Sequence, residues 1–290
     1  MMHRIRPNGC WRRGNAVALL GALLLAGCDG RFSADLAADA PADPAITQVQ
    51  ASVLGLAFQK ATGESENFEF RGSAPVDLLG LLAGTPMQLF TSERLSAGQY
   101  TGVRLLIDGN ADLTVVNSIG GEFPARLVDG PFAVVDFTVE DQQRSSESLT
   151  LTLNLRQSLT FNDVDGEYTL TPTIRTVRTD EAAQLTGFVN VTCPASVPLT
   201  TAAAVYVFAG ADVLPDDVDG IGIEPYATSR VDLSTGVITY LVRFLPPGDY
   251  TLAVTCTGDL DQPDTDDAID FVATQNARLA AGQTLQLDLT

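Results

Sequence analysis

Residues 149–156 read LTLTLNLR and place leucine at every second position. Thr150, Thr152 and Asn154 occupy the positions between the leucines. Because successive side chains of a strand point to opposite faces, this pattern predicts a β-strand with one leucine face against a core and one polar face. Residues 103–107 alternate in the same way. These two runs indicate an all-β fold.

The period of two continues along the chain from residue 46. Further strands are predicted at residues 48–58, 112–117, 132–139 and 168–177, with Gly- and Asp-containing turns at residues 108–110, 120–121, 129–130 and 165–166. Residues 76–82, with leucine at 78, 79, 81 and 82, could form one or two helical turns. Short strands at this spacing predict an antiparallel β-sandwich over residues 46–180.

Four landmarks in this region occur in a characteristic order. They are residues 76–79 (VDLL), 95–105 (LSAGQYTGVRL), 151–159 (LTLNLRQSL) and 168–175 (YTLTPTIR). In this order they resemble the bacterial lipoprotein family known as domain of unknown function 4382, over about residues 45–180. The family often has acidic residues where this chain has Thr152 and Asn154. The resemblance implies an all-β extracytoplasmic domain with no assigned activity.

Residues 181–290 form a second strand-rich block after a polar stretch. Residues 187–189, 204–208, 236–244 and 245–252 follow the order of the transthyretin-like, or carboxypeptidase-regulatory-like, β-sandwich. The Pro-Pro-Gly turn at residues 246–248, leading into a strand that starts with Tyr250, is the most specific part of this resemblance. We therefore expect two consecutive antiparallel β-sandwich domains, of which the second serves as a binding or spacer module.

The N-terminus has the features of an export signal. Four arginines precede an apolar run of about eleven residues, which is too short to span a bilayer. The run ends in Leu25-Ala26-Gly27-Cys28, which resembles a lipobox. The sequence thus predicts a signal peptide over residues 1–27, with Cys28 as the lipid attachment site. The alternative is an ordinary secretory signal in which Cys28 is incidental.

Residues 28–45 are rich in Ala, Asp and Pro, and we interpret them as a flexible linker between the lipid and the domains. Lipidation of Cys28 would make the membrane a partner without a membrane span. It predicts a location in the bacterial cell envelope, lipid-anchored and facing the periplasm or the cell surface.

Cleavage before Cys28 would change the composition of the protein. Of 17 lysines and arginines, four precede Cys28, so the mature chain would carry 13 against 36 acidic residues, a net charge of −23. This charge argues against nucleic acid as a partner. The single histidine, His3, would also be lost, which removes mechanisms and metal sites that depend on imidazole. We therefore predict no enzymatic activity.

Cys193 and Cys256 are the other cysteines of the mature chain, and each follows Val-Thr. Both continue the inward face of a predicted strand. In an oxidising compartment such a pair predicts a disulfide, and the alternative is two buried free thiols.

Acidic residues gather in two stretches of the second block. Asp212, Asp216, Asp217 and Asp219 are weak candidates for calcium ligands, and six more aspartates lie within residues 259–270. Calcium prefers several oxygen ligands, but the spacing does not match an EF-hand, and acidic runs are usually solvated surface. No other cofactor is predicted.

These features together predict a non-catalytic envelope lipoprotein that acts as a binding or structural spacer module. An envelope protein or a glycan is a possible partner. The alternatives are a calcium-dependent adhesion or glycan-binding protein and, with less support, a carbohydrate-active enzyme that uses two carboxylates. The mature chain would lack tryptophan, a common platform for sugars, and no carboxylate pair stands out.

Overall fold

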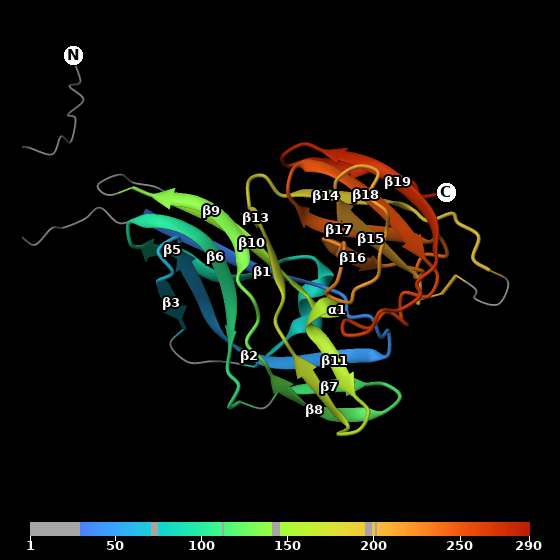
Figure 1. Cartoon of the computed structure of the whole chain (residues 1–290), viewed down its shortest axis with the longest axis horizontal. Coiled ribbons are helices and arrows are strands. Elements are labelled where there is room, and N and C mark those ends of the chain that lie inside the picture. The colour runs from blue at the N-terminus through green and yellow to red at the C-terminus, as the bar shows by residue number, and fades with distance from the viewer. Residues whose placement is uncertain (1–29, 71–74, 112, 141–145, 195–198, 201) are drawn as a thin grey trace, which may run out of the picture.

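The computed structural model describes residues 30–290, except residues 71–74, 112, 141–145, 195–198 and 201. Strands dominate the described chain and form four sheets (Figure 1). Strands between residues 30 and 178 build two of these sheets, here called the first domain, and strands between residues 183 and 286 build the other two, the second domain. The predicted all-β fold class is confirmed.

The first domain contains one four-stranded and one nine-stranded sheet. The four-stranded sheet has the order β13-β10-β1-β5, and the larger one has the order β11-β12-β8-β7-β2-β6-β9, with β3 and β4 also paired to β2. The elements are β1 (Gly30–Asp39), β2 (Ile46–Lys60), β3 (Ser65–Glu69), β4 (Pro75–Asp77), η1 (Leu78–Ala83), β5 (Met87–Leu95), β6 (Gly98–Ile107), β7 (Thr114–Asn117), β8 (Gly121–Leu127), β9 (Ala133–Val139), β10 (Ser146–Asn154), α1 (Leu155–Ser158), β11 (Leu159–Asn162), β12 (Glu167–Leu170) and β13 (Ile174–Arg178).

The second domain packs a three-stranded sheet of order β17-β14-β20 against a four-stranded sheet of order β16-β15-β18-β19. Its strands are β14 (Ala183–Phe188), β15 (Ala204–Ala209), β16 (Ala227–Arg230), β17 (Thr239–Leu245), β18 (Gly248–Thr255), β19 (Phe271–Leu279) and β20 (Thr284–Gln286). Most pairs in both domains are antiparallel. Among the named strands three pairs are parallel, namely β1 with β10, β8 with β12, and β14 with β20.

The flexible linker predicted for residues 28–45 is wrong for residues 30–39. They form β1, which pairs with β10 on one side and β5 on the other. Phe32 and Leu36 are fully buried, and the Phe32 ring lies against Phe58 with a centroid distance of 4.9 Å. Ala34, between them, lies in the same core. The Ala- and Asp-rich residues that we interpreted as a spacer therefore form a central strand of the sheet.

The 149–155 strand is confirmed up to Asn154, where β10 ends, but the expectation of a half-buried strand is wrong, because the polar residues Thr150, Thr152 and Asn154 are buried as well. The next four residues form the single helical turn α1 rather than continuing the strand. The helical turn expected at residues 76–82 is present as η1, a 3-10 helix whose Asp77 cap accepts a hydrogen bond from the Leu79 amide. The strand predicted at residues 168–177 is divided into β12 and β13.

Strand β15 is buried on both faces. Val205 and Val207 point into the core between the two sheets of the second domain. Tyr206 and Phe208 belong to a separate small cluster on the opposite face, packed with Val218 and Phe271. Two loops, residues 210–226 and 256–270, therefore cover a face of this sheet that would otherwise be exposed.

Cys193 and Cys256 form a disulfide, with a Cα–Cα distance of 6.0 Å. It ties the end of β18 to the segment after β14, 63 residues earlier in the chain. Within the described residues, no helix has the length and apolar character needed to cross a membrane.

The burial of β1 gives a first prediction. Phe32→Ala should lower the free energy of unfolding by about 3–5 kcal/mol, because it opens a cavity among the rings of Phe58, Phe68 and Phe90. Thr47→Ala, on an exposed position of β2, is the control; it removes one exposed hydrogen bond to the Val116 carbonyl and should change the free energy of unfolding by less than about 1.5 kcal/mol. Urea unfolding measures both, and an unchanged Phe32→Ala protein would contradict the placement of β1.

Candidate functional site

The first domain reaches the second through α1. The Asn154 side chain accepts a hydrogen bond of 3.2 Å from the Gln157 amide, and the Ser158 hydroxyl donates to the Asn154 carbonyl. These contacts end the strand and start a turn, as capping side chains do. The turn directs Arg156 and Gln157 away from the first core. Gln157 donates to Glu224 and to the Pro225 carbonyl of the second domain.

Arg156 is almost completely buried between the two domains, with 2% of its surface exposed. One terminal nitrogen of its guanidinium donates to the Tyr206 hydroxyl at 3.0 Å, to the Gly258 carbonyl and to the Asp261 carboxylate at 3.4 Å. The guanidinium also lies over the Tyr206 ring, 5.1 Å from its centroid. A buried charge needs such partners, because desolvation alone would strongly disfavour it.

Close packing of the 256–270 loop creates these acceptors. A Cβ atom at Gly258 would lie 2.7 Å from Cβ of Ala204 on β15, so only glycine lets the loop approach the sheet this closely. Asp261, which lies in the same loop, is fully buried, and its Oδ1 accepts a hydrogen bond from the Val218 amide at 2.9 Å. Its Oδ2, which faces Arg156, also accepts a hydrogen bond from the Tyr206 hydroxyl. Burial and the Asp261 charge keep the pKa of Tyr206 well above its ordinary value.

A second buried arginine, Arg175 on β13, also points toward the second domain. Its guanidinium pairs with Asp39 at 3.1 Å and donates to the carbonyls of Arg243 and Phe244 at 2.9 and 2.5 Å. Phe244 has a φ of 56°, a left-handed conformation that non-glycine residues rarely adopt. Burial raises the pKa of Asp39, while the charge of Arg175 opposes this shift.

Two arginines of the second domain reach in the opposite direction. Arg243 donates to the carbonyls of Leu82 and Gly84, each at 2.7 Å, at the end of η1. Arg230 donates to the Pro41 carbonyl at 2.8 Å and to the Asp43 carbonyl. Burial, with the nearby charge of Arg156, lowers the pKa of Arg230 to about 10. Arginines from both domains thus cross the junction between them.

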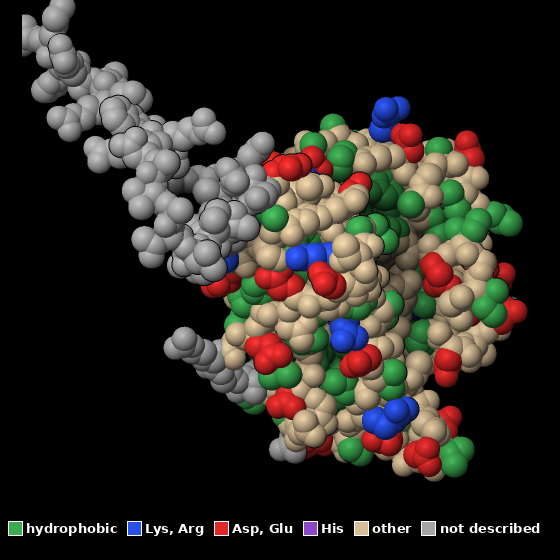
Figure 2. Space-filling view, turned by 60° about the vertical axis from the view of Figure 1, so that its left-hand side comes forward, with side chains coloured by type: hydrophobic (Ala, Val, Ile, Leu, Met, Phe, Trp, Pro, Cys, Tyr) green, Lys and Arg blue, Asp and Glu red, His purple; other side chains and the backbone are tan. Residues whose placement is uncertain are grey.

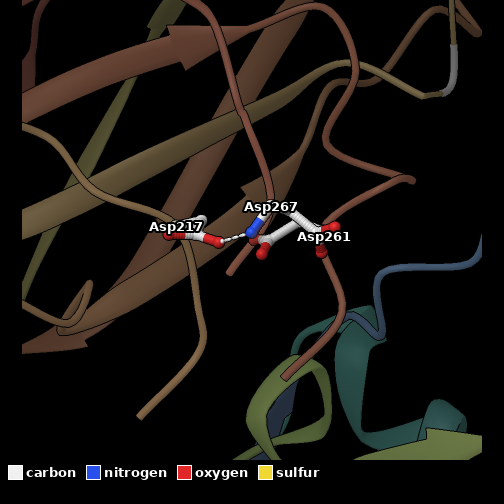
Figure 3. A group of neighbouring side chains, drawn as sticks. All are labelled: Asp217, Asp261 and Asp267. Carbon is white, nitrogen blue, oxygen red and sulfur yellow. Dashed lines mark hydrogen bonds between the residues drawn. The ribbon is translucent and has the colours of Figure 1, made fainter. Parts of the chain in front are cut away.

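A group of carboxylates lies beside this junction (Figure 3). Oxygens of Asp217, Asp261 and Asp267 lie within 4.8 Å of one another, a geometry that could hold a metal ion. Asp217 is buried and accepts a hydrogen bond from the Asp267 amide, and Asp267 accepts one from the Gln262 amide at 2.8 Å. Burial raises the pKa of Asp217, and the neighbouring carboxylates add to the shift.

The predicted calcium ligands separate into two groups. Asp217 and Asp219 come together, and Asp266 completes a second set of three. Asp212 lies elsewhere, bound to the Asn276 amide at 2.7 Å, and Asp216 is in neither set. Asp261 already pairs with the Arg156 guanidinium, which supplies the positive charge that a metal ion would otherwise supply to this carboxylate.

Sequence reasoning missed Arg156 as a site residue. In the pattern LTLTLNLR it occupies a polar position, and nothing in the alternation marks it as buried. The available signal was Asn154, a residue that favours helix starts and could have indicated a turn. The predicted lipid attachment site, Cys28, lies outside the described residues.

Comparison with protein families finds one match. Residues 30–172 match the family described as "Domain of unknown function (DUF4382)". The resemblance predicted for the first domain is confirmed, and the match starts at β1 rather than near residue 45. The resemblance of residues 181–290 to the transthyretin-like sandwich stays a prediction. No curated protein matches the chain.

Several solved structures show distant similarity. The Bacillus anthracis TIE protein has 11% identity and a TM-score of 0.21, covering 90% of this chain and 34% of its own length. The fimbrial anchor protein Mfa2 from Porphyromonas gingivalis has 10% identity and a TM-score of 0.20, covering 87% and 99%. A fimbrial protein from Bacteroides ovatus has 9% identity and a TM-score of 0.17, covering 90% and 48%. These scores are too low to transfer a fold or a function.

The electrostatics of Asp217 give a second prediction. Asp217→Asn keeps an oxygen for the Asp267 amide and removes a buried charge, so in chelator the variant should melt at or above the wild-type temperature. Since folding raises the pKa of Asp217, wild-type stability falls as pH rises through the range between the ordinary and the raised pKa. The difference between the two proteins should therefore close when the pH falls below about 3.9.

Millimolar calcium then tests the metal hypothesis in the same melting experiment. An ion held by Asp217 would raise the melting temperature of the wild type and leave that of the Asp217→Asn variant unchanged. Equal melting temperatures with and without calcium in both proteins would contradict a calcium site here.

Proposed function

We propose that this protein is a non-catalytic envelope lipoprotein, anchored through Cys28, whose two β domains act as one rigid binding or spacer module at the membrane surface. The observation that carries the proposal is the set of four arginines that cross the domain junction. Two of these arginines come from each domain, so the same interface is held by contacts made from both sides.

The acceptors of these arginines explain why the junction would be rigid. Most are backbone carbonyls, such as those of Leu82, Gly258 and Arg243, and their positions are fixed by the surrounding strands and turns. A guanidinium is planar and presents several donors in a fixed geometry, so each contact restricts orientation as well as distance. A hinge between domains would instead be expected to have a small, more mobile interface.

The absence of an enzymatic role is part of the proposal. It is supported by the predicted loss of the single histidine with the signal peptide. The carboxylates of Asp217, Asp261 and Asp267 are engaged in hydrogen bonds to the loops, which favours a structural role for them over a catalytic pair. Calcium-dependent adhesion is the second candidate, favoured by the geometry of the same three carboxylates.

Removal of one arginine tests the rigid junction. Arg156→Ala should lower the free energy of unfolding by about 3–5 kcal/mol, because it leaves the fully buried Asp261 without its ion-pair partner. Small-angle scattering should show a broader distribution of domain separations. The control is Arg104→Ala, whose partner Asp129 is 81% exposed, and it should cost less than about 1 kcal/mol.

A double variant separates the ion pair from simple loss of packing. Arg156→Met combined with Asp261→Asn keeps the volume of the long side chain and an acceptor for the Val218 amide, and should recover much of the stability. If the double variant is no more stable than Arg156→Ala, the unpaired Asp261 is not the cause of the loss.

The anchor requires its own experiment in a bacterial host that processes lipoproteins. Cells fed an alkyne-labelled fatty acid should label the wild-type protein, which should sediment with membranes. Cys28→Ser should lose the label and the membrane association, while Cys10→Ser should keep both. An unlabelled wild-type protein would contradict the lipoprotein assignment and would leave the junction prediction untouched.

A further inference from the structure

A cleft of about 660 Å³ opens between the two domains on the side of β11. The hairpins β7–β8 and β11–β12 of the first domain form one wall, and residues 259–265 of the second domain form the other. Its volume is in the range of ligand sites, which often lie between domains. Because the arginine contacts fix the two domains, the cleft has a defined shape.

Aromatic rings form the inner surface of the first wall. Phe161 is in contact with Phe123 and Tyr168, with ring centroids 5.4 and 4.7 Å away. Tyr168 is buried, whereas Phe161 is 37% exposed and lines the cleft. Ile119, at the tip of the β7–β8 hairpin, is 89% exposed beside it. The wall thus offers an aromatic face and an aliphatic side chain to an occupant.

Carboxylates surround this aromatic surface. Asp163 contributes from the first domain, and Asp259 and Asp264 from the second. Within the described chain these three accept no hydrogen bond from a side chain or amide and form no ion pair with lysine or arginine. A fourth, Asp43, is held by the Ala45 amide and by Asn117. Among the described residues that line the cleft, none is a lysine, arginine or histidine.

The aromatic wall and the carboxylates together determine which charge a ligand of the cleft should carry. Anionic ligands would meet uncompensated carboxylates on both walls. A neutral sugar could stack on Phe161 but would gain no ion pair from Asp163, Asp259 and Asp264. An ammonium or guanidinium group would pair with the carboxylates and lie over the Phe161 ring, while its aliphatic stem packs against Ile119.

The exposed apolar residues around the opening favour a peptide over a small free cation. Val164 and Leu260, next in sequence to Asp163 and Asp259, are 93% and 60% exposed. One comes from each domain, and each adjoins in sequence a residue that lines the cleft. An extended segment that alternates basic and apolar residues would place its charges in the cleft and its apolar side chains against these two residues.

We propose that this cleft binds a basic, apolar-containing segment of a partner protein, with lysine or arginine side chains inserted between Phe161 and the carboxylates of Asp163, Asp259 and Asp264. This assignment rests on the proposed binding role and names its ligand class. It is independent of the lipid anchor and of the spacer role.

The test uses the full-length chain and a synthetic octapeptide of alternating arginine and leucine. Fluorescence anisotropy should show binding that weakens at least about tenfold between 50 and 500 mM salt, because the screening length shortens. The same peptide with glutamate in place of arginine should not bind. A chain that binds neutral oligosaccharides and not the basic peptide would overturn the proposal.

Variants separate the cleft from the overall negative charge. Asp163→Asn, Asp259→Asn and Asp264→Asn together should weaken peptide binding at least about tenfold, as should Phe161→Ala. The matched control removes the same charge from Glu69, Glu93 and Glu140, which are exposed and do not line the cleft. They lie on or beside β3, β5 and β9, away from β8 and β11 (Figure 1).

The control variant should weaken binding by less than about threefold, which reflects only the long-range field. Equal loss in the two triple variants would mean nonspecific attraction to an acidic surface and would overturn the cleft assignment. Unchanged melting temperatures establish that each variant is folded. Failure of peptide binding would leave lipidation of Cys28 and the rigid junction standing, so the two proposals fail separately.

Discussion

The burial of Arg156 is the constraint on which the arrangement of the two domains depends. A guanidinium removed from water must have acceptors that do not move, and Arg156 finds them in Tyr206, Gly258 and Asp261 of the other domain. Tyr206 belongs to β15 itself, and the other two acceptors are in place only because residues 256–270 fold back over the outer face of this strand. The first domain therefore fits against a surface that the second domain's own loop creates, and a change in either would leave a buried charge unsatisfied.

The distribution of positive charge follows from the same junction. The chain after Cys28 has 13 basic residues, and four of them are used between the domains, where they contact carbonyls and two buried aspartates. Few remain to balance 36 acidic residues, and acidic side chains are spread over the face seen in Figure 2 with fewer basic ones among them. The uncompensated carboxylates of the cleft are thus a consequence of where the arginines are placed.

The sequence predicted the parts of the fold that depend on local pattern. Leucine alternation at residues 149–155 identified β10, and apolar alternation identified β2, β6 and β9, whereas β15 and β18 were indicated by the order of landmarks in the second block. It failed for β1, because Ala and Asp dominate residues 30–39 and the two large apolar residues, Phe32 and Leu36, are too few to show a period. The insertion of β1 between β10 and β5 is a pairing across more than 50 residues, which no local pattern encodes.

The acidic stretches show the same limit at the level of single side chains. From the sequence, Asp212 and Asp217 are equivalent members of one run, as are Asp259 and Asp261 of another. In the fold, Asp261 faces a guanidinium and Asp217 accepts a loop amide, while Asp259 lines an open cleft with no ion-pair partner among the described residues. What separates a structural carboxylate from one available to a ligand is the position of Arg156, which crosses from the first domain, and of the Gly258 turn, which packs on β15 within the second domain. Burial and partners, rather than acidic composition, therefore decide which aspartates can bind anything.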